Sequence, residues 1–117
     1  MNYIKRNLEK IVIELSEQYP VILITGPRQV GKTTMLQKLM EGTNRTYVSL
    51  DDLNNRALAK SDPAMFFQIH ETPILIDEVQ YAPELFTYIK IMVDKNRVPG
   101  EFWLTGSQMF KLMDGVQ

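Results

Sequence analysis

A chain of 117 residues and 13.6 kDa has room for one domain. Its hydrophobic and charged fractions, 44% and 23%, are ordinary for a soluble globular protein, and its net charge of −1 gives no basic excess that would indicate nucleic acid. The sequence has no cysteine, which excludes disulfides and thiolate metal sites and favours a cytoplasmic location. No apolar run approaches the roughly 20 residues of a membrane span.

The N-terminal region carries apolar residues at helical spacing, separated by charged residues. This pattern predicts an amphipathic helix over about residues 4–18, which ends before Pro20 and packs on the edge of the core. The apolar positions are Ile4, Leu8, Ile11, Val12 and Leu15.

An apolar run at residues 21–25 predicts a strand buried on both faces of a parallel sheet. The next residues have the pattern G-x-x-x-x-G-K-T and run into a helical pattern that should end near Gly42. In such a loop the backbone N–H groups surround the phosphates of a nucleoside triphosphate at a helix N-terminus. Lys32 then reaches the β- and γ-phosphates, and the Thr33 hydroxyl binds Mg²⁺. The expected phosphate loop comprises Gly26, Pro27, Arg28, Gln29, Val30, Gly31, Lys32, Thr33 and Thr34.

Three further strands are predicted, at residues 46–50, 73–77 and 101–105, with helical segments between them. Asp51 and Asp52 can cap a short helix through about Lys60, and Pro63 and Pro83 mark two further helix starts. Strands that alternate with helices imply right-handed crossovers and a parallel sheet covered on both faces. We therefore expect an α/β fold with three layers.

Two acidic residues, Asp77 and Glu78, close the third predicted strand. Carboxyl ends of parallel strands are where open α/β sheets bind ligands. Asp77 is suited to hold Mg²⁺ through its water shell, because Mg²⁺ keeps several waters and accepts few carboxylates. Glu78 is suited to orient and deprotonate a water that attacks the γ-phosphate.

The fourth predicted strand ends in small polar residues, in the segment Leu104-Thr105-Gly106-Ser107-Gln108. A hydroxyl there can hydrogen-bond the γ-phosphate or the attacking water. Ser107 is the first choice for this role and Thr105 the second, since the sequence does not show which side chain faces the ligand.

Together these motifs resemble the AAA-type group of P-loop ATPases, and more narrowly a prokaryotic family of AAA-type ATP-binding proteins with a second domain downstream. The resemblance covers nearly the whole chain and rests on residues 26–34, Leu50-Asp51-Asp52, residues 75–80 and residues 104–108. It implies a P-loop NTPase core with ATP and Mg²⁺ as ligands. It also implies roles for Lys32 and Thr33 at the phosphates and metal, for Asp77 at the metal, for Glu78 as catalytic glutamate, and for Thr105 or Ser107 as sensor.

The same resemblance implies parts that this sequence lacks. Family cores have the strand order 5-1-4-3-2, a helical lid and an arginine finger, so we expect residues 1–117 to be the N-terminal portion of such a domain. The first strand would then be an exposed edge that favours self-association. Because an arginine finger contributes on the order of 10³–10⁵ in rate, we expect this piece to bind ATP better than it hydrolyses it. Arg45, Arg56 and Arg97 are interpreted as surface residues or carboxylate partners.

Other P-loop classes fit less well. A GTPase would need glycine three residues after Asp77, where Gln80 stands, and an Asn-Lys-x-Asp motif, which is absent. Two alternatives stay open: a small-molecule kinase, and a nucleotide-dependent switch without significant turnover. His70 lies in an apolar helix without a second metal ligand at suitable spacing, which favours a structural role.

Overall fold

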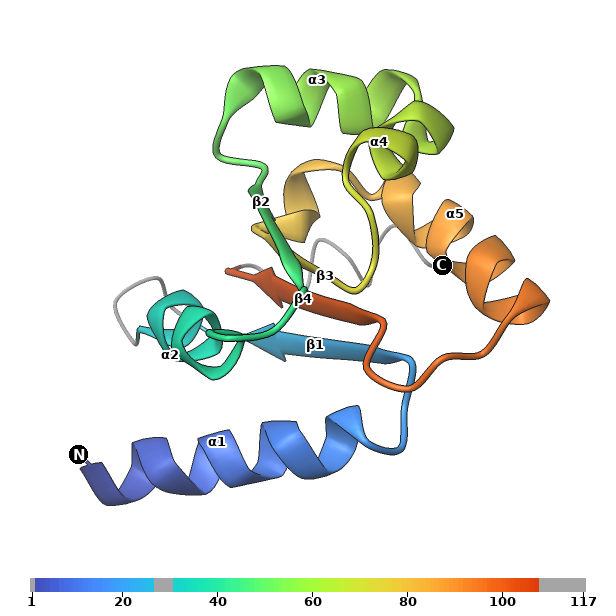
Figure 1. Cartoon of the computed structure of the whole chain (residues 1–117). Coiled ribbons are helices and arrows are strands. Elements are labelled where there is room, and N and C mark those ends of the chain that lie inside the picture. The colour runs from blue at the N-terminus through green and yellow to red at the C-terminus, as the bar shows by residue number, and fades with distance from the viewer. Residues whose placement is uncertain (1, 27–30, 108–117) are drawn as a thin grey trace.

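The computed structural model describes residues 2–26 and 31–107. Residues 27–30, in the middle of the expected phosphate loop, and Gln108 therefore lie outside the described residues. Figure 1 shows the arrangement of the helices and strands. In chain order the elements are α1 (Asn2–Ser16), β1 (Val21–Thr25), α2 (Lys32–Leu39), β2 (Thr46–Ser49), α3 (Leu53–Ser61), α4 (Pro63–Ile69), β3 (Ile74–Asp77), the 3₁₀ turn η2 (Val79–Tyr81), α5 (Glu84–Lys95) and β4 (Phe102–Gly106).

The four strands form one parallel sheet in the order β1-β4-β3-β2. The pairing places Thr25 beside Gly106, and Ser49 beside Asp77, at the carboxyl ends of the strands. The predicted α/β class and the order of these strands are confirmed. Strand bounds differ from the prediction by one residue at most, since β2 ends at Ser49, β3 begins at Ile74 and β4 covers residues 102–106.

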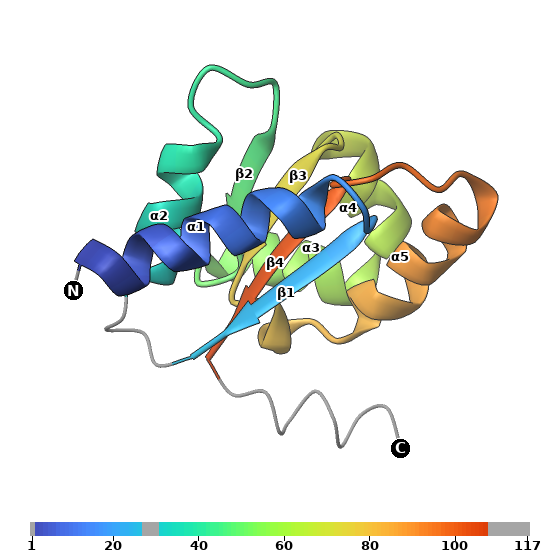
Figure 2. The ribbon, with the colours of Figure 1, turned by 90° about the horizontal axis from the view of Figure 1, so that it is seen from below.

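Helices cover both faces of this sheet, which gives the predicted three layers. Helices α1 and α2 lie on one face, as the view from below makes clear (Figure 2), and α3, α4 and α5 pack on the other. Side chains of β4 alternate accordingly, with Trp103 facing α1 and α2 and its neighbours Phe102 and Leu104 facing the other layer. The period-2 alternation of the strands thus fills two separate cores.

The larger core lies under α3, α4 and α5, and the smaller one under α1 and α2. The larger consists of Val48, Leu50, Ala59, Phe66, Phe67, Ile74, Ile76, Val79, Ala82, Leu85, Ile89, Phe102 and Leu104. The smaller consists of Val12, Ile22, Met35, Leu36, Leu75 and Trp103. Position 75 of β3 contributes to the smaller core, so the next position on that face, Asp77, emerges on the side of α2.

The bounds of two helices differ from those predicted from the sequence. Helix α1 spans Asn2–Ser16, two residues earlier at each end than predicted, and α2 ends at Leu39, before the expected Gly42. Helix α3 begins as expected, because the Asp52 carboxylate accepts hydrogen bonds from the backbone N–H groups of Asn54 and Asn55. The turn η2 directly after Glu78 was not predicted.

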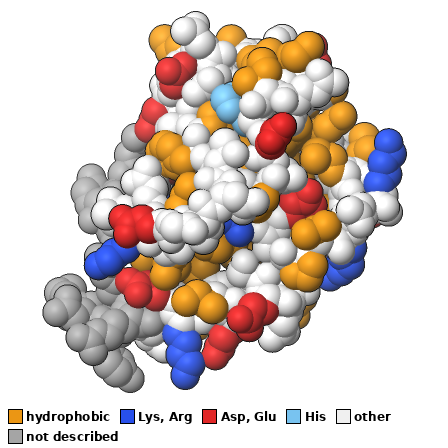
Figure 3. Space-filling model, viewed as in Figure 1, with side chains coloured by type: hydrophobic (Ala, Val, Ile, Leu, Met, Phe, Trp, Pro, Cys, Tyr) orange, Lys and Arg blue, Asp and Glu red, His pale blue; other side chains and the backbone are white. Residues whose placement is uncertain are grey.

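Within the described part of the chain, β1 pairs with β4 alone and forms one edge of the sheet. Self-association along this edge stays a prediction. None of the described helices is both long and apolar enough to span a membrane. Acidic and basic side chains are scattered over the face seen in Figure 3, and no basic patch gathers on that face.

Candidate functional site

The expected site residues meet where the strands end, on the side of the sheet that α2 covers. Asp77 is the last residue of β3, and Thr105 lies one residue before the end of the neighbouring strand β4. Lys32 and Thr33 begin α2, which follows β1 through the loop. Three sequence motifs far apart in the chain therefore converge on one edge, as parallel topology requires.

Asp77 is the centre of a buried hydrogen-bond network. Its Oδ1 atom accepts hydrogen bonds from Thr33 Oγ1 and from Thr105 Oγ1, both at 2.6 Å. Its Oδ2 atom accepts a third from Ser49 Oγ at 3.2 Å. Since only 6% of Asp77 is exposed, these donors compensate for the loss of water around the carboxylate. The network joins the phosphate loop to β2, β3 and β4.

Lys32 is also buried, with 3% of its surface exposed, and its Nζ atom donates to the carbonyl oxygen of Gly26 at 3.1 Å. This contact links the two described ends of the phosphate loop. Gly31 caps α2 with φ of 73°, in the left-handed region that glycine adopts without strain. Thr34 is exposed on the first turn of the helix. Pro27, Arg28, Gln29 and Val30 lie outside the described residues.

Glu78 has an unusual backbone for a glutamate, with φ of 61° and ψ of 50°. Its backbone N–H donates to Thr105 Oγ1 at 3.0 Å, and 4% of the residue is exposed. Its Oε1 atom accepts from Ser107 Oγ and from Gln80 Nε2, each at 2.7 Å. A left-handed conformation in such a residue costs on the order of 1–3 kcal/mol and is typical of functional sites.

The two sensor candidates have different surroundings. Thr105 is fully buried, and its hydroxyl contacts Asp77 and the backbone of Glu78. Ser107 is half-buried, and its hydroxyl contacts the side chain of Glu78. Ser107 is therefore the more exposed of the two, and the choice between them as sensor stays a prediction.

Sequence reasoning missed three residues at this site, namely Ser49, Asp51 and Gln80. Asp51 and Gln80 belong to the segments that carry the family resemblance, but Asp51 was considered only as a helix cap and Gln80 was given no role. The strand alternation was the available signal for Ser49, because residues 47 and 49 of β2 share the face of Asp77. Tyr47 on that face has its pKa raised by burial and, to a lesser degree, by the charge of Asp77.

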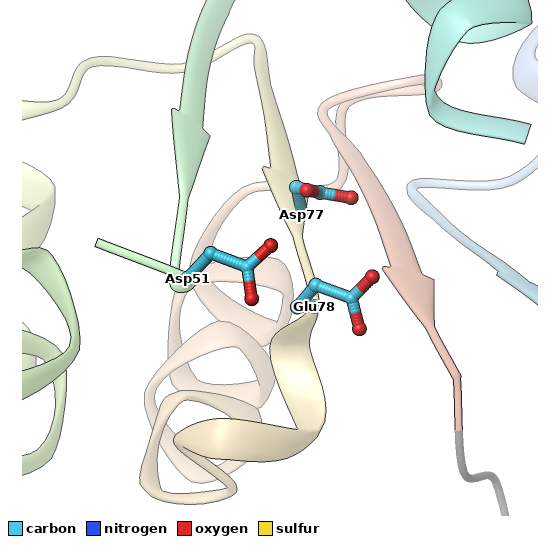
Figure 4. A group of neighbouring side chains, drawn as sticks. All are labelled: Asp51, Asp77 and Glu78. Carbon is cyan, nitrogen blue, oxygen red and sulfur yellow. The ribbon is translucent and has the colours of Figure 1, made fainter. Parts of the chain in front are cut away.

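The oxygen donors at this edge fit a hard divalent cation. One carboxylate oxygen from each of Asp51, Asp77 and Glu78 lies within 4.8 Å of the others, and Figure 4 shows these side chains at the ends of β2 and β3. The Thr33 hydroxyl is in direct contact with Asp77. A set made only of carboxylate and hydroxyl oxygens suits Mg²⁺ and lacks the sulfur or imidazole ligands of softer metals.

The interpretation of Arg45 and Arg56 as surface residues or carboxylate partners was wrong. The guanidinium of Arg45 lies 3.9 Å from the centre of the Trp103 ring, and burial lowers its pKa to about 10. The guanidinium of Arg56 lies 3.7 Å from the centre of the Tyr81 ring, and it donates to the carbonyl oxygen of Leu50. Both arginines bind aromatic rings and backbone.

The chain resembles known proteins in sequence. Residues 18–117 match the family described as AAA domain. An uncharacterized protein of Mycobacterium tuberculosis and one of Mycobacterium bovis are each 36% identical over 89 residues. The match covers 75% of this chain but 20% of each of those proteins, so the chain spans about a fifth of the length of these relatives.

Solved structures show the same fold. A DNA replication initiation factor superposes with a TM-score of 0.63 at 22% identity, covering 99% of this chain and 41% of that one. AMPPCP-bound DnaA from Aquifex aeolicus superposes with a TM-score of 0.59 at 20% identity, and the match covers the same shares of the two chains. The family match covers most of the chain, and the fold is that of a P-loop NTPase core. The chain therefore belongs to the AAA domain family, as its motifs predicted.

Proposed function

We propose that this domain binds ATP with Mg²⁺, and that the intact protein hydrolyses the ATP by attack of water on the γ-phosphate. One observation carries the proposal: a single carboxylate, that of Asp77, contacts Thr33 from the phosphate loop and Thr105 from the fourth strand. Each motif alone occurs in proteins without this activity. Their convergence on one buried atom supports a common ligand.

Binding would use the first turn of α2. The ammonium group of Lys32, which contacts the loop carbonyl of Gly26, would exchange this partner for phosphate oxygens. Thr33 and Asp77 would hold the Mg²⁺, with Asp51 near enough to take part through water. Bound Mg²⁺ would neutralise charge on the phosphates. The loop N–H groups and the helix N-terminus favour the same anion.

Hydrolysis would depend on Glu78, whose carboxylate lies beside the end of β4. Glu78 would orient the attacking water and accept its proton. Thr105 would hold the backbone of Glu78 and the carboxylate of Asp77 in place, and Ser107 would contact the γ-phosphate or the water. Positioning and electrostatics supply most of the catalysis in phosphoryl transfer, which suits a site whose side chains are joined by hydrogen bonds.

Similar proteins support the nucleotide part of the proposal. The DnaA of the solved structure is bound to AMPPCP, an ATP analogue, and shares the fold of this chain. The matched relatives extend well beyond the region aligned with this chain, so turnover is proposed for the intact protein. A kinase would transfer the γ-phosphoryl group to an acceptor hydroxyl. The acidic pair at the end of β3 favours activation of water instead.

The test compares Glu78→Gln with Glu84→Gln, an exposed glutamate at the start of α5. We expect the first variant to release phosphate at least about 100-fold more slowly while it binds Mg·ATP normally. The second variant should match the parent in both assays. Equal release by parent and Glu78→Gln would refute the role of Glu78. Binding by the parent without any release would leave the nucleotide-dependent switch as its function.

A further inference from the structure

Glu78 has a second side-chain partner besides Ser107, and this partner has no role in the function proposed above. Gln80, two residues later in η2, donates from Nε2 to Glu78 Oε1 at 2.7 Å. The other atom of the same amide, Oε1, accepts from the backbone N–H of Ser107 at 3.3 Å. The amide therefore contacts both the carboxylate of Glu78 and the end of β4.

These contacts form a closed ring of three residues. Glu78 Oε1 accepts from Gln80 and from Ser107 Oγ, and the Gln80 amide accepts from the backbone of Ser107. The orientation of the amide follows from this ring, since the reversed orientation would bring its oxygen against the carboxylate. A side chain that only donates or only accepts hydrogen bonds cannot make both contacts.

The backbone brings Gln80 to this place. The left-handed conformation of Glu78 turns the chain out of β3, and the N–H of Tyr81 donates back to the carbonyl oxygen of Glu78 at 3.2 Å. Tyr81 is in turn covered by Arg56, which is hydrogen-bonded to Leu50 beyond the end of β2. The turn that carries Gln80 is thus linked to the segment after β2 through Arg56, and to Ser107 after β4 through Gln80 itself.

We infer that Gln80 is a positioning residue that holds the carboxylate of Glu78 in the orientation needed to activate water. This inference rests on the proposed function of Glu78. Ser107 is expected to contact the γ-phosphate or the attacking water, and a hydroxyl that donates to either no longer donates to Glu78. Gln80 then still donates a hydrogen bond that helps to keep the carboxylate in place while ATP is bound.

The experiment uses Gln80→Met in the intact protein, because methionine keeps the length of the side chain and removes both amide groups. The control is Gln68→Met, an exposed glutamine on α4. We expect Gln80→Met to slow single-turnover phosphate release by about 10- to 100-fold, as for a misplaced catalytic group, with the Kd for Mg·ATP within about 2-fold of the parent. The control should leave release and affinity unchanged.

A second background separates positioning from general structural damage. In a Glu78→Gln protein, adding Gln80→Met should cause no further loss of release, because the group that Gln80 positions is already inactive. A further loss of release as large as the one that Gln80→Met causes in the parent protein would overturn the inference. If Gln80→Met lowers the thermal midpoint below the assay temperature, the Gln80→Glu variant is used instead. Its carboxylate retains an acceptor for the backbone N–H of Ser107. Repulsion between this carboxylate and Glu78 should slow phosphate release at least as much.

The outcomes distinguish this inference from the proposed function. If Glu78→Gln slows release and Gln80→Met does not, Gln80 has no positioning role and the proposed function stands. If Glu78→Gln itself releases phosphate at the rate of the parent, the proposed catalytic role is wrong, and the inference about Gln80 is overturned with it.

Discussion

Trp103 and Thr105 lie two residues apart on the same face of β4, yet they belong to two very different regions. The ring of Trp103 is covered by the guanidinium of Arg45, and the indole Nε1 donates to Ser16 Oγ of α1 at 3.0 Å. Around Thr105 the partners are polar, with Asp77 and the backbone of Glu78 sharing one hydroxyl. We call the first the packing region and the second the polar region.

The two regions differ in what surrounds their polar groups. In the packing region, the indole is buried among the apolar side chains of the smaller core, and Ser16 of α1 and Arg45 contact it. In the polar region, a carboxylate is buried against hydroxyl groups, and such networks are costly unless every group is paired. Changes in the packing region should therefore reduce stability, and changes in the polar region should reduce binding or turnover.

The largest expected effect on stability comes from Trp103→Ala. Removal of a buried indole should lower the free energy of unfolding by about 3–5 kcal/mol, measured by urea denaturation. Trp103→Phe, which keeps a ring, should cost less. The folded fraction of either variant should bind Mg·ATP with the affinity of the parent. A tenfold weaker affinity in folded protein would contradict the separation of the two regions.

Thr105→Val should have a smaller effect on stability and a larger one on function. The change removes the Thr105 hydroxyl that accepts from the backbone N–H of Glu78 and donates to Asp77 Oδ1, while Thr33 still donates to that oxygen. We expect a cost of about 1–3 kcal/mol. Thr105→Ser keeps the hydroxyl and serves as control. We expect phosphate release to fall in the valine variant and to be retained in the serine variant. Normal release by the valine variant would show that the network does not hold Glu78.

The smallest effect is expected for Arg45→Met. Methionine keeps much of the apolar stem, so the loss is mainly that of the cation over the indole, about 0.5–2 kcal/mol. The coupling is measured by a double-mutant cycle with Trp103→Leu, in which the effect of Arg45→Met should shrink. If the effect persists undiminished in that background, Arg45 stabilises the fold through its hydrogen bond to Ile74 instead.

The fold was largely predictable because its signals are local and redundant. Apolar runs, proline and aspartate at helix starts, and the phosphate-loop pattern each marked a boundary. The packing of the arginines was not predictable, since a guanidinium on the surface and one over an aromatic ring have the same local sequence. Arg45 is near Trp103 only after β2 and β4 join the same sheet.

The sequence pointed to some members of the site, but not to Ser49 or Gln80, nor to the hydrogen bonds that connect the site. Asp77 and Glu78 were identifiable because acidic residues at the end of a buried strand have few structural explanations. The role of Gln80 depends on the left-handed backbone of Glu78, and glutamate gives no signal for that conformation. Ser49 faces Asp77 only through the register of β2 with β3, which pairs residues 28 apart.

ATP binding at the first turn of α2 is the property that tests the proposed nucleotide site most directly. Lys32 is buried at the proposed site, and Lys38 is exposed on the same helix, so Lys38→Ala is a matched control for Lys32→Ala. In calorimetric titrations with Mg·ATP, Lys32→Ala should weaken binding by on the order of 10- to 100-fold, as expected for loss of a charged hydrogen bond. Lys38→Ala should bind as the parent does. Equal affinity of the parent and both variants would contradict the assignment of this edge of the sheet as the nucleotide site.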